Sequence, residues 1–84
     1  MSVSFTRPSD ESERDLCERK GWKVGDFLEG TEGGPEWSIT AVIELLYIGP
    51  HIVVARQVER NGSPYVTRER SWTLMHRDWV KVIR

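Results

Sequence analysis

The sequence of 84 residues contains one cysteine, Cys17, and no long apolar run. A chain with one cysteine cannot form an internal disulfide, which favours a reducing compartment. No apolar segment approaches the ~20 residues that a membrane-spanning helix needs. Residues 1–10 also lack the apolar stretch of a secretory signal. We therefore expect a cytoplasmic protein with no membrane partner.

Residues that commonly carry chemistry are also scarce. The two histidines, His51 and His76, and Cys17 do not show the spacing of zinc ligands. Cys17 has no histidine within reach in the sequence that could activate it as a nucleophile. The glycines of residues 30–34 are interleaved with acids, which would repel a phosphate group. We therefore expect no metal, no cofactor and no enzymatic activity.

Charge is divided unevenly along a chain whose formal net charge is only −1. Residues 22–48 carry five acids and one base, a net charge of −4, whereas residues 49–84 carry seven bases and three acids, a net charge of +4. Two interpretations stay open. The opposite charges meet across neighbouring strands and cancel, or they form a polarised surface that orients a charged partner.

The pattern from Trp22 onward predicts an all-β domain of five strands. The predicted strands cover residues 23–29, 37–48, 52–60, 65–74 and 80–83. A Gly- and Pro-rich loop at 30–36 follows the first strand, and a 3₁₀ turn at 76–79 precedes the last. Asn61-Gly62 predicts a tight hairpin turn. Simple pairing from that turn would set Val54 opposite Glu69, so we also expect a β-bulge.

Residues 1–21 differ from the rest because they are rich in charge and poor in apolar side chains. We predict a charged N-terminal arm here, either a short marginal helix ending at Gly21 or a disordered segment. Only Leu16 and Cys17 could dock such a helix on a core. The domain organisation that we expect is therefore an arm at 1–21 and a β-domain at 22–84.

The order and spacing of the predicted strands resemble the SH3 fold, a small five-stranded barrel. The ending Asp78-Trp79-Val80-Lys81-Val82 resembles the SH3 ending, in which a 3₁₀ turn leads into a valine-rich strand. The chain departs from signalling SH3 domains because it lacks their Ala-Leu-Tyr-Asp-Tyr start and their paired tryptophans. Recognition of proline-rich peptides is therefore not implied.

A second resemblance rests on three groups of residues. They are Trp22 to Gly30 (W-x-V-G-D-x-L-E-G), Ile39-Thr40-Ala41 with Val54-Ala55-Arg56, and Trp72 to Trp79 (W-T-L-x-x-R-D-W). Over residues 22–84 these resemble a family of small uncharacterised bacteriophage proteins. The resemblance implies a workplace in the bacterial host cytoplasm, and for this class of protein it implies binding to a host protein. It brings no active-site residue with it.

One candidate site combines acids with aromatic residues. Tryptophan is a common interface anchor, and the predicted loop 30–36 is acidic. The candidate protein-binding residues are Glu29, Glu32, Glu36, Trp37, Tyr47 and Trp79. The alternative for the tryptophans is burial in the core.

A second candidate site combines basic residues with a tyrosine on the predicted hairpin. Basic residues beside aromatic rings are typical of single-stranded nucleic acid binding. The candidate residues are Arg56, Arg60, Tyr65, Arg68 and Arg70. The sequence pI of about 6.1 argues against a strong phosphate-binding surface.

These observations favour a non-enzymatic binding module, and three functions stay open. The first is a phage-encoded inhibitor or modulator that binds a host protein. The second is a nucleic-acid-binding barrel. The third is a structural or homo-oligomeric phage component, monomer or homodimer, that associates through free sheet edges.

Overall fold

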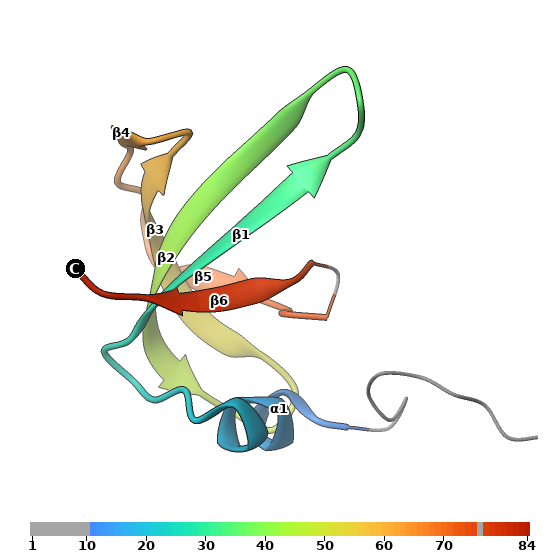
Figure 1. The fold of residues 1–84 in the computed structure, drawn as a ribbon. Helices are drawn as coiled ribbons and strands as arrows, with labels where there is room; N and C mark the ends of the chain where they lie inside the picture. The colour runs from blue at the N-terminus through green and yellow to red at the C-terminus, as the bar shows by residue number, and fades with distance from the viewer. Residues whose placement is uncertain (1–10, 76) are drawn as a thin grey trace, which may run out of the picture.

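The computed structural model describes residues 11–75 and 77–84. In chain order, the described elements are α1 (Glu13–Lys20), β1 (Phe27–Gly33), β2 (Ser38–Ile48), β3 (Val53–Arg60), β4 (Ser63–Pro64), β5 (Arg70–Trp72) and β6 (Trp79–Val82), shown in Figure 1. The predicted all-β class with a short N-terminal helix is therefore confirmed. The first ten residues of the predicted arm, and position 76 of the predicted turn, lie outside the described residues.

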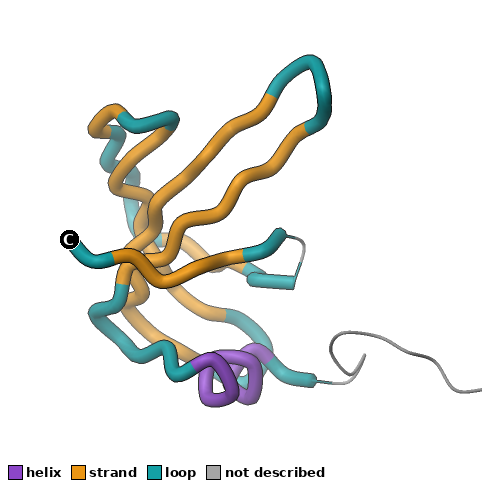
Figure 2. The backbone as a smooth tube through the Cα atoms, viewed as in Figure 1, coloured by secondary structure: helices purple, strands orange, loops and turns teal. Residues whose placement is uncertain are grey.

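The strands form one antiparallel sheet in the order β4-β3-β2-β1-β6, and β5 pairs with β3. Strands that are neighbours in the chain pair with each other, and β6 returns to lie beside β1. The sheet curves strongly (Figure 2). This meander, with its last strand beside its first, is the SH3-like order that the sequence predicts.

The sequence predicts five strands, whereas the described part of the chain has six, because the return arm of the hairpin, predicted as one strand at 65–74, is divided into β4 and β5. The SH3-like barrel is not closed, since β5 does not pair with β6. The rings of Trp72 on β5 and Trp79 on β6 contact each other edge to face, with their centroids 6.0 Å apart. Strands that share hydrogen bonds lie about 4.8 Å apart. The barrel therefore stays open along a seam that aromatic side chains bridge.

The core lies inside the curved sheet and includes side chains from α1. Its buried apolar members are Leu16, Cys17, Trp22, Leu28, Ile43, Leu45, Val53, Ala55, Leu74 and Trp79. Leu16 and Cys17 dock the helix on the sheet, as the sequence predicts. Glu13 is only 3% exposed, and its carboxylate accepts a hydrogen bond of 2.9 Å from the backbone N–H of Leu74. One end of the chain thus caps a backbone group near the other end.

Helix α1 has a regular beginning and end. The Ser12 side chain accepts a hydrogen bond from the Asp15 N–H at 3.0 Å, as a good N-cap does. Acids lie in its first turn and bases in its last, which suits the helix dipole. Gly21 ends the helix in the left-handed region at φ 77°, as predicted. This segment is therefore a capped helix that packs on the sheet.

The predicted return strand at 65–74 is only partly correct. Asn61 and Gly62 have φ values of 51° and 83°, which confirms the tight turn. Glu59 pairs with Pro64, whereas Ala55, four residues earlier, pairs with Arg70, six residues later. Two extra residues must therefore fit between β4 and β5, which confirms the predicted irregularity. It also leaves residues 65–69 outside regular strand pairing.

The predicted first strand and the predicted loop are both displaced. A turn occupies residues 23–26, where the Asp26 carboxylate accepts a hydrogen bond from the Lys23 N–H at 2.9 Å. Strand β1 therefore begins at Phe27 and continues to Gly33, through residues predicted to be loop. The predicted 3₁₀ turn is not seen in the described part of 76–79, where a bend at Arg77 leads into β6.

Candidate functional site at the ribbon tip

Strands β1 and β2 continue beyond the body of the sheet as a two-stranded ribbon (Figures 1 and 2). All side chains of residues 31–38 are exposed to solvent. We call residues 31–40 the ribbon tip. They include two acids, Glu32 and Glu36, and no basic residue. The tip therefore projects a negatively charged surface that takes no part in the core.

The backbone of the ribbon tip is well defined by its pairing. Strand pairing continues out to Gly33 and Ser38, and the Gly34 N–H donates to the Trp37 carbonyl at 2.7 Å. Gly33 has a φ of 140°, and a Cβ there would lie 2.4 Å from the Trp37 carbonyl oxygen. Only glycine fits this position, so the turn that presents Trp37 depends on it.

The root of the ribbon rests on a stack of side chains. A Cβ at Gly30 would lie 2.7 Å from the Trp79 ring, so glycine permits the ring to pack directly on the β1 backbone. The Arg77 guanidinium lies 4.9 Å from the Trp79 ring centroid and 2.6 Å from the Glu32 carboxylate. Arg77 also donates to the Gly30 carbonyl at 3.3 Å. Trp79 and Arg77 therefore support β1 where it leaves the sheet.

The structure brings together part of the predicted protein-binding set. Glu32, Glu36 and Trp37 lie at the ribbon tip, and Trp37 is 59% exposed. Tyr47 is also exposed but lies ten residues further along β2, roughly 30 Å away at the usual rise per residue. Glu29 lies within the sheet, between Val42 on β2 and Val80 on β6.

The prediction that Trp79 is an exposed anchor is wrong, because its side chain is 4% exposed. Its ring fills the space above Gly30 and closes the seam toward Trp72. A glycine, which has no Cβ, leaves room for a large aromatic ring in a core this small. The acidic site is therefore the ribbon tip, with Trp37 as its one exposed aromatic side chain.

The predicted basic site is divided among three places. Arg56 and Arg68 line a shallow depression of about 360 Å³ together with Thr67 and Glu69. Arg56 is already paired with Glu44 at 2.7 Å. The other basic candidates stack on aromatic rings: Arg60 lies over Tyr65 at 5.5 Å, and Arg70 lies over Trp72 at 4.9 Å.

Opposite charges from residues 22–48 and residues 49–84 form ion pairs across the structure. This agrees with the first interpretation of the charge division, in which the charges cancel. Three ion pairs join acids of residues 22–48 to bases of residues 49–84: Glu32 with Arg77, Glu44 with Arg56 and Asp26 with Lys81. The remaining acid of the ribbon tip, Glu36, has no ion pair among the described residues. A negative charge that is unpaired within the described part of the chain therefore lies next to Trp37.

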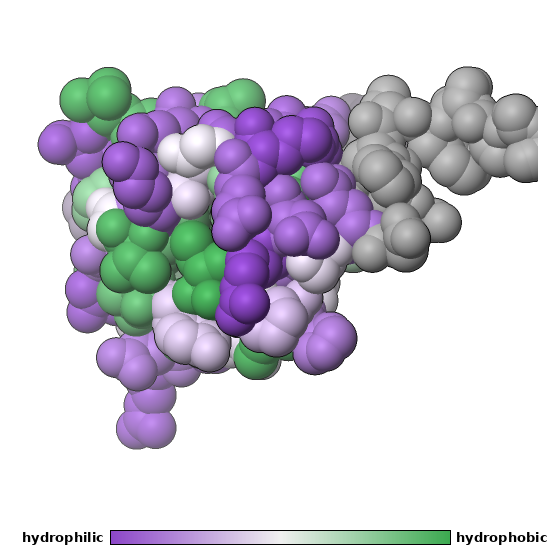
Figure 3. Space-filling model, turned by 90° about the horizontal axis from the view of Figure 1, so that it is seen from below, coloured by the Kyte–Doolittle hydropathy of each residue, from purple (hydrophilic) through white to green (hydrophobic). Residues whose placement is uncertain are grey.

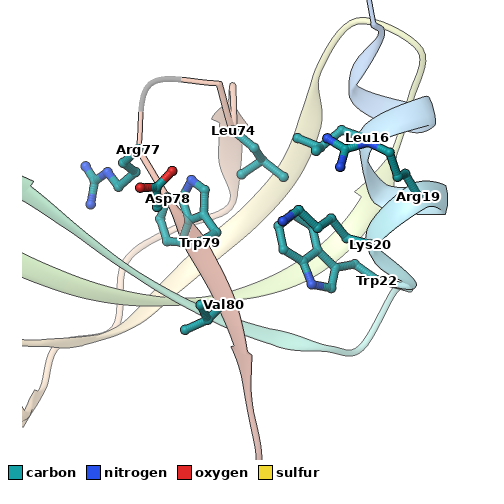
Figure 4. A pocket seen from close by; sticks show the side chains of 9 residues that line it. All are labelled: Leu16, Arg19, Lys20, Trp22, Leu74, Arg77, Asp78, Trp79 and Val80. Atoms are coloured by element: carbon teal, nitrogen blue, oxygen red, sulfur yellow. The ribbon is translucent and has the colours of Figure 1, made fainter. Parts of the chain in front are cut away.

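A cleft that sequence reasoning did not predict lies between α1 and β6 (Figure 4). It has a volume of about 310 Å³, and its apolar lining includes Leu16, Trp22, Leu74 and Trp79. Arg19, Lys20, Arg77 and Asp78 add charge around it. Seen from the side on which α1 lies, groups of apolar side chains are exposed among hydrophilic ones (Figure 3). No local sequence pattern predicts this cleft, because its two walls are about 55 residues apart in sequence.

Cys17 is unsuited to nucleophilic chemistry. The side chain is 1% exposed. Burial, with the neighbouring Glu13 carboxylate as a second cause, raises the pKa of the Cys17 thiol to about 11, and only the thiolate is a strong nucleophile. Within the described residues, no three histidine, cysteine, aspartate or glutamate side chains are grouped so that they could hold a metal ion.

The comparisons with known proteins identify a family. A family model described as "Domain of unknown function (DUF7241)" matches residues 11–84. The chain belongs to this family. The DUF7241 match covers α1 as well as the strands. No curated protein and no solved structure matches the chain. In the described residues, no helix is long and apolar enough to cross a membrane.

Proposed function

We propose that this DUF7241 chain is a non-enzymatic protein-binding module whose ribbon tip enters a pocket of its partner. The observation that carries the proposal is Trp37, which is 59% exposed at the end of a ribbon whose residues 31–38 are all exposed. An indole ring held in water by a fixed turn is costly to solvate and gains most when a partner buries it.

The charge of the ribbon tip indicates the kind of partner. Glu36 lies next to Trp37 and has no ion pair among the described residues, and the Glu32 side chain, although paired with Arg77, is 53% exposed. A partner with an apolar pocket inside a basic rim would match this surface. Phosphate groups would be repelled by it. That the partner is a host protein stays a prediction.

Capture from bacterial lysate tests this proposal. We expect the tagged chain to retain a defined protein, and Trp37→Ala to lose it by roughly 30-fold or more in affinity, as hot-spot residues do. Tyr47→Ala is the matched control, because Tyr47 is 54% exposed but lies far from the tip. Equal capture by the Trp37→Ala and wild-type chains would refute the role of the ribbon tip.

Nucleic acid binding is the second candidate, and one observation favours it. Arg60, Arg68 and Arg70 make no ion pair with any described residue, and Arg60 lies over the Tyr65 ring. Glu69 lines the same depression as Arg68, which weakens its attraction for phosphate. A salt titration with single-stranded oligonucleotides decides the matter, because phosphate binding weakens steeply with salt. Absence of binding at low salt removes this candidate.

A further inference from the structure

Strand β6 is a terminal strand of the sheet. Among the described strands it pairs only with β1, through residues Trp79 to Val82. Alternate backbone N–H and C=O groups of such a strand point away from the sheet, and these groups are available to another strand. The same strand carries Val80, which is 56% exposed, and is followed by Ile83, which is 90% exposed. The edge therefore combines exposed apolar side chains with backbone hydrogen-bonding groups that lack a partner strand among the described residues.

The usual protection of an edge strand is weak here. Edge strands are commonly blocked by lysine, proline or a bulge. In β6 the only such residue is Lys81, and its ammonium group lies 3.5 Å from the Asp26 carboxylate of the same molecule. The four residues pair with β1 without a register shift. The edge of β6 is thus regular, and among the described strands none pairs with it on the side away from β1.

We propose that two copies of this chain associate through β6, in an antiparallel two-fold arrangement centred on Val80. In a two-fold interface the same strand contributes from both copies. A two-fold axis through one residue pair keeps the side chains of both strands on matching faces of a continuous sheet. Val80 then faces Val80 of the second copy, and the two exposed valines cover each other.

Charge selects this register over its neighbours, because like charges directly opposite each other destabilise a sheet. A centre at Lys81 would set the two copies of Lys81 against each other. A centre at Trp79 would set Arg77 against Lys81. With the centre at Val80, Lys81 faces Trp79 and Val82 faces Asp78, so no like charges are opposed.

The same register brings apolar surface to the cleft between α1 and β6. Arg77 and Asp78 lie at its β6 side, and continuation of the pairing sets Ile83 of the second copy opposite Arg77. The exposed isoleucine of each copy then lies beside the apolar cleft of the other. Trp37 takes no part in this pairing. The association is therefore independent of the function proposed for the ribbon tip.

Sedimentation equilibrium tests the association. We expect the mean mass of the wild-type chain to rise from one copy toward two over a roughly hundredfold range of concentration. Val80→Asp should remain a single copy, since two carboxylates would face each other. Val66→Asp, at a position that is 70% exposed in the segment between β4 and β5, should behave as the wild type. A wild-type mass of one copy at every concentration would overturn the proposal.

Cysteine cross-linking tests the register in the chain of 84 residues. Facing Cα atoms in an antiparallel pair lie about 4.5 or 5.5 Å apart, and both distances suit a disulfide. Val80→Cys should therefore oxidise to a covalent dimer. Lys81→Cys is the control, because its two copies would lie about 8 Å apart, beyond disulfide reach. Cys17 is buried and does not interfere. Equal or faster cross-linking of Lys81→Cys would contradict a centre at Val80.

Discussion

Gly30 shows how one residue without a side chain decides a packing arrangement. The Trp79 ring lies where a Cβ at position 30 would be, at 2.7 Å, and the Arg77 side chain lies at 2.8 Å. Both neighbours are held, Trp79 by the core and Arg77 by Glu32. Neither side chain can therefore move away from a Cβ at position 30 without displacing β1 at the root of the ribbon.

The substitution Gly30→Ala should lower the free energy of unfolding by about 1–3 kcal/mol, because it overpacks a filled site. Urea denaturation followed by tryptophan fluorescence measures this change. Gly34→Ala is the control, since a Cβ at Gly34 would meet no atom within 4 Å. Equal stability of the two variants would show that the Trp79 ring moves freely away from Gly30.

The Cys17 thiol links stability to alkaline pH. Burial raises its pKa from 9.0 to about 11 in the folded chain, so between these values the unfolded chain loses a proton that the folded chain keeps. The contribution of the thiol to stability is therefore complete below pH 9 and is lost as the pH rises toward 11. Urea midpoints should fall more steeply over this range in the wild type than in Cys17→Ala. Parallel slopes would mean that Cys17 titrates equally in both states.

At the scale of elements, the sequence identifies turns that one or two residues determine. Asn61-Gly62 and Gly21 adopt positive φ values where expected, because few other residues tolerate that conformation. The course of β1 through Gly30 and Gly33 was missed, because glycine indicates a loop locally. Pairing with β2 and packing under Trp79 override that preference. Burial of Trp79 could not be predicted for the same reason, since it depends on a residue 49 positions away.

The ribbon is an element without a core of its own, and it should open locally. We expect the Gly34 amide, which bonds to the Trp37 carbonyl at the tip, to exchange with solvent hydrogen at least roughly 100-fold faster than the Leu45 amide. Leu45 is fully buried, and its amide bonds to the Asp26 carbonyl at 2.9 Å. Hydrogen exchange followed by NMR measures both. Similar rates would show that the ribbon unfolds only with the whole domain.

At the scale of the whole molecule, distant parts of the chain depend on each other. The Glu13 carboxylate satisfies the Leu74 amide, and three ion pairs join the acidic first half to the basic second half. The composition alone left both interpretations of this charge division open, because it does not contain the register that brings the charges together.

A chain beginning at Trp22 should therefore be much less stable than one beginning at Glu11. It lacks Leu16 and Cys17, and loss of one buried leucine side chain alone costs about 2–5 kcal/mol. It also leaves the Leu74 amide without its acceptor, which costs about 1–3 kcal/mol. A domain of this size has about 4–12 kcal/mol in total. Thermal melting by circular dichroism compares the two chains, and an unchanged midpoint would show that α1 is dispensable.

The ribbon tip has a consequence for how this family changes over time. Because residues 31–38 bury nothing, substitutions there escape the constraint that folding imposes on interior positions. Gly33 in the turn, Gly30 at the root and Glu32, which pairs with Arg77, must be preserved. Selection can thus alter what the molecule recognises while the scaffold beneath stays intact, and an engineer could replace the other residues of 31–38 to graft a new specificity.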